Sequence, residues 1–302
     1  MTQEKRLRRL RRSMMFLNAQ RPALLKDAYI YKPDSLLLDL EDAVAENQKD
    51  AARFSLYNAL KTVDYRGVEK IVRINGLDTP HWQEDIRVAV AGGADGIRIA
   101  KCETAQDVQT VVKHIEMAEE EFGAEKGFTL VMAALESPLG IINAFDICKA
   151  CPERMLGVAI SGGDYRKSMQ ASYNPGGIEM LGGRANMLIA ARAAGVQCFD
   201  TVFTDVDDEE GFRQEVIQNK QMGFDGKSLI SPKQIAIVHE IFTPSEKEIR
   251  TAERIVRAVR EQAAQGIGVF TLDGKMLDIA FVPGAERTIE LAKASGVYEG
   301  DL

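Results

Sequence analysis

The chain alternates short apolar runs with longer segments that have helical spacing. Eight of these runs are continuous instead of alternating with polar residues, as expected for strands buried on both faces of a parallel sheet. They lie at 14–17, 35–40, 70–76, 96–101, within 131–140, within 156–165, at 197–202 and at 226–230. Helical spacing between them is clearest at 49–60, 85–91, 104–122 and 184–194.

This alternation predicts an α/β protein with a closed (β/α)8 TIM barrel, because each strand is followed by a helical segment. An open, doubly wound sheet is the alternative. That fold favours a Gly-x-Gly-x-x-Gly fingerprint after an early strand, and the sequence contains neither this fingerprint nor a Gly-x-x-x-x-Gly-Lys-Ser/Thr loop. The barrel predicts that functional side chains gather at the carboxyl ends of the strands.

The pattern changes after Thr243-Pro244. Ser245 and Glu248 form a capping box that opens a helix, 268–279 has the pattern of a hairpin turning at Asp273-Gly274, and a last helix follows at 285–294. The sequence therefore predicts a catalytic barrel at 1–243 and a helix–hairpin–helix extension at 244–302. A barrel does not need this extension, and we expect it to contact a neighbouring subunit.

Composition narrows the class of protein. Of the 302 residues, 45% are hydrophobic and 27% charged, as in soluble globular proteins. No apolar run approaches the roughly 20 residues that span a bilayer, and no signal peptide is visible, so we expect a cytoplasmic protein with no membrane partner. The net charge of −7 argues against a nucleic-acid partner. The four cysteines and three histidines show no spacing typical of a metal or disulfide framework.

A basic run, Lys-Arg-Leu-Arg-Arg-Leu-Arg-Arg at 5–12, departs from this acidic balance. It is either a solvated arm or helical turn that leads into the first strand, which we favour, or a site for a nucleic acid, an anionic membrane, a phosphorylated ligand or an acidic partner.

Two carboxylates carry the main chemical hypothesis. Glu136 and Asp164 each follow an apolar run, and the 28 residues that separate them match one strand–helix–strand unit. Neighbouring parallel strands lie roughly 4.8 Å apart, so both acids would reach one hard cation. Magnesium takes one or two carboxylates and fills its other positions with water or substrate. The alternative is that each acid only caps the helix that follows it.

Other polar residues follow the same strand ends: Asp39, Glu41, Asp42, Arg73, Asn75, Lys101, Gly162 and Gly163. An arginine at this place suits a substrate carboxylate, because its planar fork binds one in a bidentate manner. Backbone N–H groups at the two glycines suit an anion. Together with a metal, this set favours carbon–carbon cleavage beside a carboxylate. A Schiff-base aldolase using Lys101 is the alternative.

These motifs resemble the citrate lyase β-subunit family, in the group of citryl-, malyl- and citramalyl-CoA lyases and the HpcH/HpaI aldolase-like superfamily. The resemblance covers nearly the whole chain. It is carried by Leu-Asp-Leu-Glu-Asp-Ala-Val at 38–44, Val-Arg-Ile-Asn-Gly at 72–76, Glu-Ser-Pro-Leu-Gly at 136–140, Gly-Phe-Asp-Gly-Lys-Ser-Leu-Ile at 223–230 and Gly-Lys-Met-Leu-Asp at 274–278.

The resemblance implies a TIM barrel with a C-terminal extension, assembled as a trimer or hexamer. It implies that Glu136 and Asp164 hold Mg²⁺ and that Arg73 binds the carboxylate of a 2-oxoacid. Glu41 and Asp42 would contact the metal through water. Asp278 would reach the site of a neighbouring subunit as a catalytic acid or base.

The chain departs from the family pattern at Asn18-Ala19, at Gly163, where relatives have an acid, and at Ala100, where they have proline. We expect a Mg²⁺-dependent lyase that cleaves a citryl or (S)-citramalyl thioester of CoA or an acyl carrier protein. If CoA is the carrier, Arg21, Lys49, Arg53 and the basic run are candidates for its phosphates, although we favour a plain surface position for each of them. The alternatives are a non-catalytic subunit, alone or with citrate lyase partner subunits, and a metal-dependent aldolase acting on free 2-oxoacids.

Overall fold

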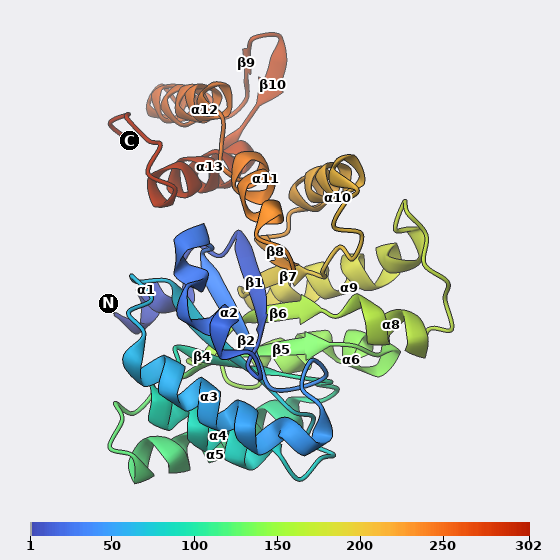
Figure 1. Ribbon diagram of the computed structural model, residues 1–302. Helices are drawn as coiled ribbons and strands as arrows, with labels where there is room; N and C mark the ends of the chain where they lie inside the picture. The colour runs from blue at the N-terminus through green and yellow to red at the C-terminus, as the bar shows by residue number, and fades with distance from the viewer. Residues whose placement is uncertain (1) are drawn as a thin grey trace. The chain divides into compact units, whose positions relative to one another are not determined.

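The computed structural model describes residues 2–302 and divides into two compact units, the first ending at His239 and the second spanning Glu240–Leu302. In the first unit, eight parallel strands close into a barrel in sequence order (Figure 1). They are β1 (Ser13–Asn18), β2 (Ser35–Asp39), β3 (Glu69–Ile74), β4 (Gly96–Ile99), β5 (Leu130–Leu135), β6 (Met155–Ile160), β7 (Gln197–Asp200) and β8 (Gly226–Leu229). The predicted (β/α)8 TIM barrel is confirmed.

Helices follow the strands and cover the outside of the barrel (Figure 1). Helices α3, α4 and α5 pack against one another in order along it. The α-helices of this part of the chain are α1 (Gln3–Leu7), α2 (Pro22–Lys26), α3 (Lys49–Thr62), α4 (Trp82–Gly92), α5 (Ala105–Glu121), α6 (Pro138–Ile142), α7 (Ala144–Lys149), α8 (Gly162–Ser168), α9 (Ile178–Ala194), α10 (Glu209–Met222) and α11 (Lys233–Phe242), which contains the unit boundary; η1 (Ala28–Tyr31) and η2 (Glu46–Gln48) are short 3-10 turns.

Apolar side chains from alternate strand positions fill the barrel, as the continuous apolar runs predict. The cluster consists of Met14, Leu37, Ile71, Leu130, Met132, Leu156, Ala159 and Phe199, with Leu7 and Phe16 packed against it. Gly157 is needed where β6 meets β7, because a Cβ there would lie 2.4 Å from the carbonyl oxygen of Gln197. The apolar cluster thus fills the interior of the barrel, and polar residues lie at both ends of the strands.

The basic run at 5–12 packs across the amino-terminal ends of the strands. Arg11 is fully buried and donates to both carboxylate oxygens of Glu69 at 2.7 Å and to Gln197 Oε1 at 2.6 Å. Arg12 makes a bidentate contact with Asp34, and Arg6 donates to the carbonyl oxygen of Asp95. The favoured interpretation is confirmed as a helical turn, α1, that leads into β1, whereas a solvated arm is wrong for these three arginines. Their charges serve the fold, and they are held by carboxylates and carbonyl oxygens of the first unit.

The second unit contains α12 (Glu246–Ala264), a hairpin of β9 (Phe270–Leu272) and β10 (Lys275–Leu277), η3 (Ile279–Phe281) and α13 (Val282–Ala294). Ser245 and Glu248 form the predicted capping box. Asp273 and Gly274 have positive φ angles of 50° and 76°, as a tight hairpin turn requires. Helices α12 and α13 share an apolar core. The predicted helix–hairpin–helix is confirmed, whereas its contact with a neighbouring subunit stays a prediction.

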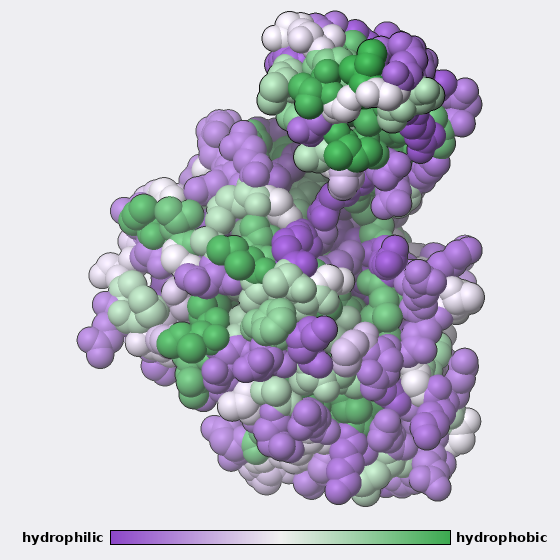
Figure 2. All heavy atoms as spheres, turned by 180° about the vertical axis from the view of Figure 1, so that it is seen from behind, coloured by the Kyte–Doolittle hydropathy of each residue, from purple (hydrophilic) through white to green (hydrophobic). Residues whose placement is uncertain are grey.

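On the face that Figure 2 shows, polar side chains alternate with separate patches of apolar side chains. None of the helices within residues 2–302 is both long enough and apolar enough to cross a bilayer. The cysteine thiols are all buried and free of disulfides.

Candidate active site

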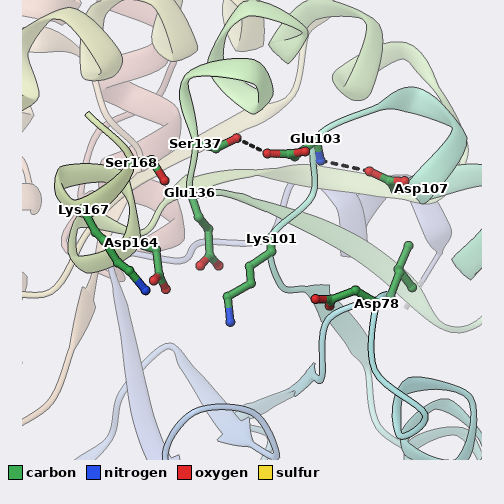
Figure 3. A pocket seen from close by; sticks show the side chains of 10 residues that line it. Asp78, Lys101, Glu103, Asp107, Glu136, Ser137, Asp164, Lys167 and Ser168 are labelled. Atoms are coloured by element: carbon green, nitrogen blue, oxygen red, sulfur yellow. Dashed lines mark hydrogen bonds between the residues drawn. The ribbon is translucent and has the colours of Figure 1, made fainter. Parts of the chain in front are cut away.

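The carboxyl ends of the strands border two cavities that share Asp164 in their walls. The first, of about 450 Å³, is drawn in Figure 3 and is lined by Leu77, Asp78, Lys101, Glu103, Asp107, Glu136, Ser137, Asp164, Lys167 and Ser168. The second cavity has a volume of about 420 Å³ and borders the same strand ends. Its lining includes Phe16, Asn18, Asp39, Arg73, Arg98, Ser161, Gly163 and Ser228. Most of the polar residues predicted from the strand ends thus line a cavity, whereas Glu41 and Asn75 line neither of the two.

Glu136 follows β5 directly, and Asp164 lies in the first turns of α8, which follows β6. Strands β5 and β6 pair in register, with Leu135 opposite Ile160, so the predicted neighbourhood of the two strands is confirmed. The two carboxylates lie side by side and face the same cavity (Figure 3). The helix-cap alternative fails for Glu136, because the hydroxyl of Ser137 caps α6.

The carboxylate of Glu136 is buried without a direct partner in the described part of the chain. The residue is 2% exposed, and neither oxygen has a hydrogen-bond partner among residues 2–302. Burial, followed by the negative charge of Glu41, raises the pKa of Glu136 to about 7, although Arg73 opposes this shift. A buried carboxylate with two empty acceptor atoms is costly unless a cation or donor binds it.

These residues fit Mg²⁺ as a bound group. In the described part of the chain, no group of three His, Cys, Asp or Glu side chains is placed to hold a metal ion. A catalytic zinc site needs three such protein ligands. Magnesium needs only one or two carboxylates and keeps water at its other positions. Glu136 and Asp164 supply oxygen ligands of the right kind, and the free acceptor atoms of Glu136 would receive the charge of the ion.

Arg73 is the last residue but one of β3 and is held by several contacts. Its Nε and Nη2 donate to the two carboxylate oxygens of Asp39 at 2.7 and 2.6 Å, and its Nη1 lies 2.9 Å from Glu41. Its guanidinium carbon also lies 4.9 Å from the centroid of the Phe16 ring. Burial lowers the pKa of Arg73, but the charges of Asp39 and Glu41 raise it overall. The side chain is therefore a fixed cation in the wall of the second cavity.

Lys101 follows β4 in a left-handed conformation with a φ of 50°. Its ammonium group donates to Glu41 and lies 3.5 Å from Asp42. Burial lowers the pKa of Lys101, but the hydrogen bond to Glu41 and the neighbouring acids raise it overall. A Schiff base needs a neutral amine, so this environment disfavours the aldolase alternative. Glu41 is buried at the site, whereas Asp42 is exposed.

The two glycines before Asp164 differ. The N–H of Gly162 donates to Thr201 Oγ1 at 2.8 Å, so this group already has a partner. A Cβ at Gly162 would lie 3.0 Å from Thr201 Oγ1, whereas a Cβ at Gly163 would meet nothing within 4 Å. The acid missing at Gly163 therefore leaves open space in the cavity wall.

This difference gives a testable prediction. Gly163→Ala should leave the free energy of unfolding unchanged or raise it by up to about 1 kcal/mol, because alanine favours a helix. Gly162→Ala should lower it by about 1–3 kcal/mol, because its Cβ crowds the stiff side chain of Thr201. Urea denaturation of both variants measures the contrast. Equal losses would show that α8 tolerates both positions in the same way.

Several other candidates have structural roles. Lys49 is buried and donates to the carbonyl oxygens of Leu40 and Glu41 and to Asn75 Oδ1. Arg53 is buried against Asp85. The suggestion that these two residues bind CoA phosphates is therefore wrong.

Arg21 is exposed, and so stays a candidate for those phosphates. The amide of Asn18, at one departure from the family pattern, donates to the carbonyl oxygen of Ala43 at the edge of the second cavity. Asp278 lies in the second unit, where it caps η3 through the N–H of Ala280.

Sequence reasoning missed Arg98, the third residue of β4. It is 1% exposed and lines the second cavity. Burial, followed by the positive charge of Arg73, lowers its pKa to about 10. The signal that could have identified this position is a charged residue inside an otherwise apolar strand.

Comparisons with known proteins agree with this fold. Residues 12–232 match the HpcH/HpaI aldolase/citrate lyase family. The chain is 47% identical over 293 residues to the citrate lyase subunit beta of Leuconostoc mesenteroides, covering 97% of each chain. It is 34% identical over 287 residues to the (3S)-malyl-CoA thioesterase of Cereibacter sphaeroides, covering 95% of this chain and 96% of the relative.

A solved structure agrees as well. The protein CitE of Mycobacterium tuberculosis, crystallised with magnesium, acetoacetate and coenzyme A, superimposes with a TM-score of 0.76 at 28% identity, covering 93% of this chain and 98% of CitE. The matched family region contains the whole barrel and both acids of the site, and the resemblance seen in the sequence is confirmed. The chain therefore belongs to the HpcH/HpaI aldolase/citrate lyase family and is a carbon–carbon lyase by class.

Proposed function

We propose that this chain is a Mg²⁺-dependent lyase that cleaves a 3-hydroxyacyl thioester of the citryl or (S)-citramalyl type into an acetyl thioester and a 2-oxoacid. The observation that carries the proposal is the buried carboxylate of Glu136, whose two oxygens lack hydrogen-bond partners in the described part of the chain. This carboxylate lines a cavity together with Asp164, and Asp164 also lines the cavity that contains Arg73 and Arg98. Such an arrangement suits a hard cation on one side and a substrate carboxylate on the other.

The chain's own residues would position the substrate. Glu136 and Asp164 would hold Mg²⁺, which supplies positive charge to stabilise negative charge as it develops on oxygen. Glu41 and Asp42 would bind water at the metal. Arg73, fixed by Asp39, would present its remaining N–H donors to the carboxylate next to the hydroxyl carbon.

The carboxylate of Asp278 from a neighbouring subunit takes the hydroxyl proton, and the carbon–carbon bond then breaks. The hydroxyl carbon becomes the carbonyl of the 2-oxoacid, and the electron pair of the broken bond passes to the thioester as its enolate. Protonation of the enolate carbon then gives the acetyl thioester. We assign this protonation to the carboxyl group of Asp278 from a neighbouring subunit, and general acid catalysis of this kind contributes about 10²–10⁴-fold.

The proposed carrier is CoA or an acyl carrier protein, and partner subunits of a citrate lyase are further candidates. The Leuconostoc relative is named as a subunit, which supports partner subunits. The CitE crystal contains coenzyme A, which supports CoA as the carrier. We also propose a homo-oligomer, a trimer or hexamer. Large apolar residues are exposed on the adjoining helices α6, α7 and α9, among them Ile142, Ile178 and Ile189 at 80%, 66% and 69%.

A coupled assay tests the reaction. Purified protein with Mg²⁺ is given citryl-CoA and (S)-citramalyl-CoA in parallel, and acetyl-CoA and 2-oxoacid are measured together. We expect equal amounts of both products, and their loss on chelation of the metal. Free CoA without a 2-oxoacid would indicate a thioesterase, as in the Cereibacter relative. No product from either thioester, with an acyl carrier protein also supplied, would favour the non-catalytic alternative.

A further inference from the structure

Arg98 is a buried cation without a carboxylate partner. Its Nη1 and Nη2 each lie 3.2 Å from a serine hydroxyl, of Ser228 and Ser161, and its Nε has no partner in the described part of the chain. The other buried arginines each contact a carboxylate at 2.7–2.9 Å: Arg11, Arg53, Arg154 and Arg184. Arg98 is therefore the exception among them.

The surroundings of Arg98 add to its electrostatic cost. It lies directly opposite Arg73 on the neighbouring strand, and like charges in such a pair repel each other. Both guanidinium groups lie over the ring of Phe16, at 4.9 and 5.2 Å. Of the acids that act on it, Glu136 forms no hydrogen bond with Arg98 and is the proposed Mg²⁺ ligand, Asp39 contacts Arg73, and Glu41 contacts both Arg73 and Lys101. An unpaired buried charge is strongly destabilising unless it has a counterion.

The cavity supplies the place for that counterion. Arg98 and Arg73 line the same cavity of about 420 Å³, which also contains Asp164. Arg73 is already committed in part to Asp39, whereas Arg98 has a free Nε and only neutral partners. Arginine binds carboxylates through its fork of donors.

We propose that Arg98 binds a second free carboxylate of the substrate, so that the site selects thioesters whose cleavage yields a dicarboxylic 2-oxoacid. This inference rests on the proposed lyase function and names its substrate class. The citryl and citramalyl groups differ at one place, where citryl has a carboxymethyl group and citramalyl has a methyl group. Only the former gives Arg98 a counterion, and a site built for a polar group rejects an analogue that lacks it.

Binding of the two product acids tests this without turnover. Calorimetry on the Mg²⁺-loaded protein should show that oxaloacetate binds roughly 10–100-fold more tightly than pyruvate, the range expected for hydrogen bonds to a charged group. In Arg98→Met this preference should disappear while pyruvate affinity stays the same. Arg98→Lys, which keeps the charge but loses the fork, should retain part of it. Equal affinities in the unaltered protein, or a preference that survives Arg98→Met, would overturn the proposal.

Two further variants keep the test decisive. Arg87→Met on the exposed surface of α4 is the matched control and should leave both affinities unchanged. If Arg98→Met fails to fold, Ser228→Ala carries the test, because it removes a hydroxyl that holds the guanidinium and should weaken oxaloacetate binding alone.

Turnover separates this inference from the proposed function. An oxaloacetate preference that Arg98→Met abolishes, in a protein that cleaves neither thioester, would support the role of Arg98 and contradict the lyase proposal. Cleavage of citryl-CoA and citramalyl-CoA with a ratio unaltered by Arg98→Met would support the lyase and overturn the role of Arg98.

Discussion

Replacing Asp164 with Asn or Glu136 with Gln is expected to lower kcat/KM of the lyase reaction by about 10³-fold or more. Each change removes one of two negative charges that would hold Mg²⁺. The charge of a metal contributes several kcal/mol of transition-state stabilisation. A loss of about 1.4 kcal/mol lowers the rate tenfold. The coupled assay measures the loss of activity, and calorimetric titration with Mg²⁺ measures the loss of affinity.

Glu120→Gln is the control for this pair, because Glu120 is exposed on α5 and lines neither cavity of the site. It should keep full activity and full Mg²⁺ affinity. Normal Mg²⁺ affinity in both site variants would contradict the metal assignment, even if their activity fell.

A stability measurement distinguishes a metal site from an inert scaffold. In chelator, Glu136→Met should raise the free energy of unfolding by about 1–3 kcal/mol, because it removes a buried carboxylate whose oxygens lack partners. The same variant should lose the rise in Tm that Mg²⁺ gives the unaltered protein. A variant that is destabilised in chelator would show that Glu136 holds the fold in the absence of metal.

Replacing Arg11 with Met is expected to lower the free energy of unfolding by about 3–5 kcal/mol, because it leaves the buried carboxylate of Glu69 without its cation. Arg8→Met is the matched control. The side chain of Arg8 is 81% exposed, and its contact with Glu4 spans 3.8 Å, so the loss should stay within about 0.5 kcal/mol. Denaturation by urea measures both. Similar small losses in the two variants would contradict a structural role for the basic run.

The same ion pair predicts a pH dependence. Burial raises the pKa of Glu69, but the charge and hydrogen bonds of Arg11 and the hydroxyl of Ser35 lower it overall, below its ordinary value of 4.5. A carboxyl group with a lowered folded-state pKa stabilises the fold above the unfolded pKa and loses this contribution as pH falls through the folded one. Stability should therefore decrease below about pH 4.5, and Arg11→Met should flatten this decrease.

The barrel could be predicted because its signal is repeated. Each buried strand is a continuous apolar run, and the predicted runs at 35–40 and 226–230 differ from β2 and β8 by one residue at one end. Glu136 and Asp164 could be predicted because the carboxyl end of a strand is visible in the sequence. Both signals are local in the sequence, and closure of the barrel brings the carboxyl ends of the strands together.

The remaining residues depend on contacts between distant segments. Lys49 and Arg53 have the composition of a basic surface, yet both are buried against carbonyl oxygens and acids that the sequence does not place beside them. Arg98 is informative only once its lack of an acid partner is known. The partners of buried charges follow from the closed barrel, and helical spacing or strand alternation carries no information about them.

The contact between Arg11 and Gln197 has a consequence for synthesis on the ribosome. The two residues are 186 positions apart, and β1 also pairs with β8. The segment around β1 thus finds its binding partners only after the ribosome has translated the residues up to β7 and β8. Contacts between such distant segments slow folding, and a nascent chain that waits for them exposes apolar strands. Truncated nascent chains that end before β7 should therefore remain bound to chaperones, and release should follow once β8 has emerged.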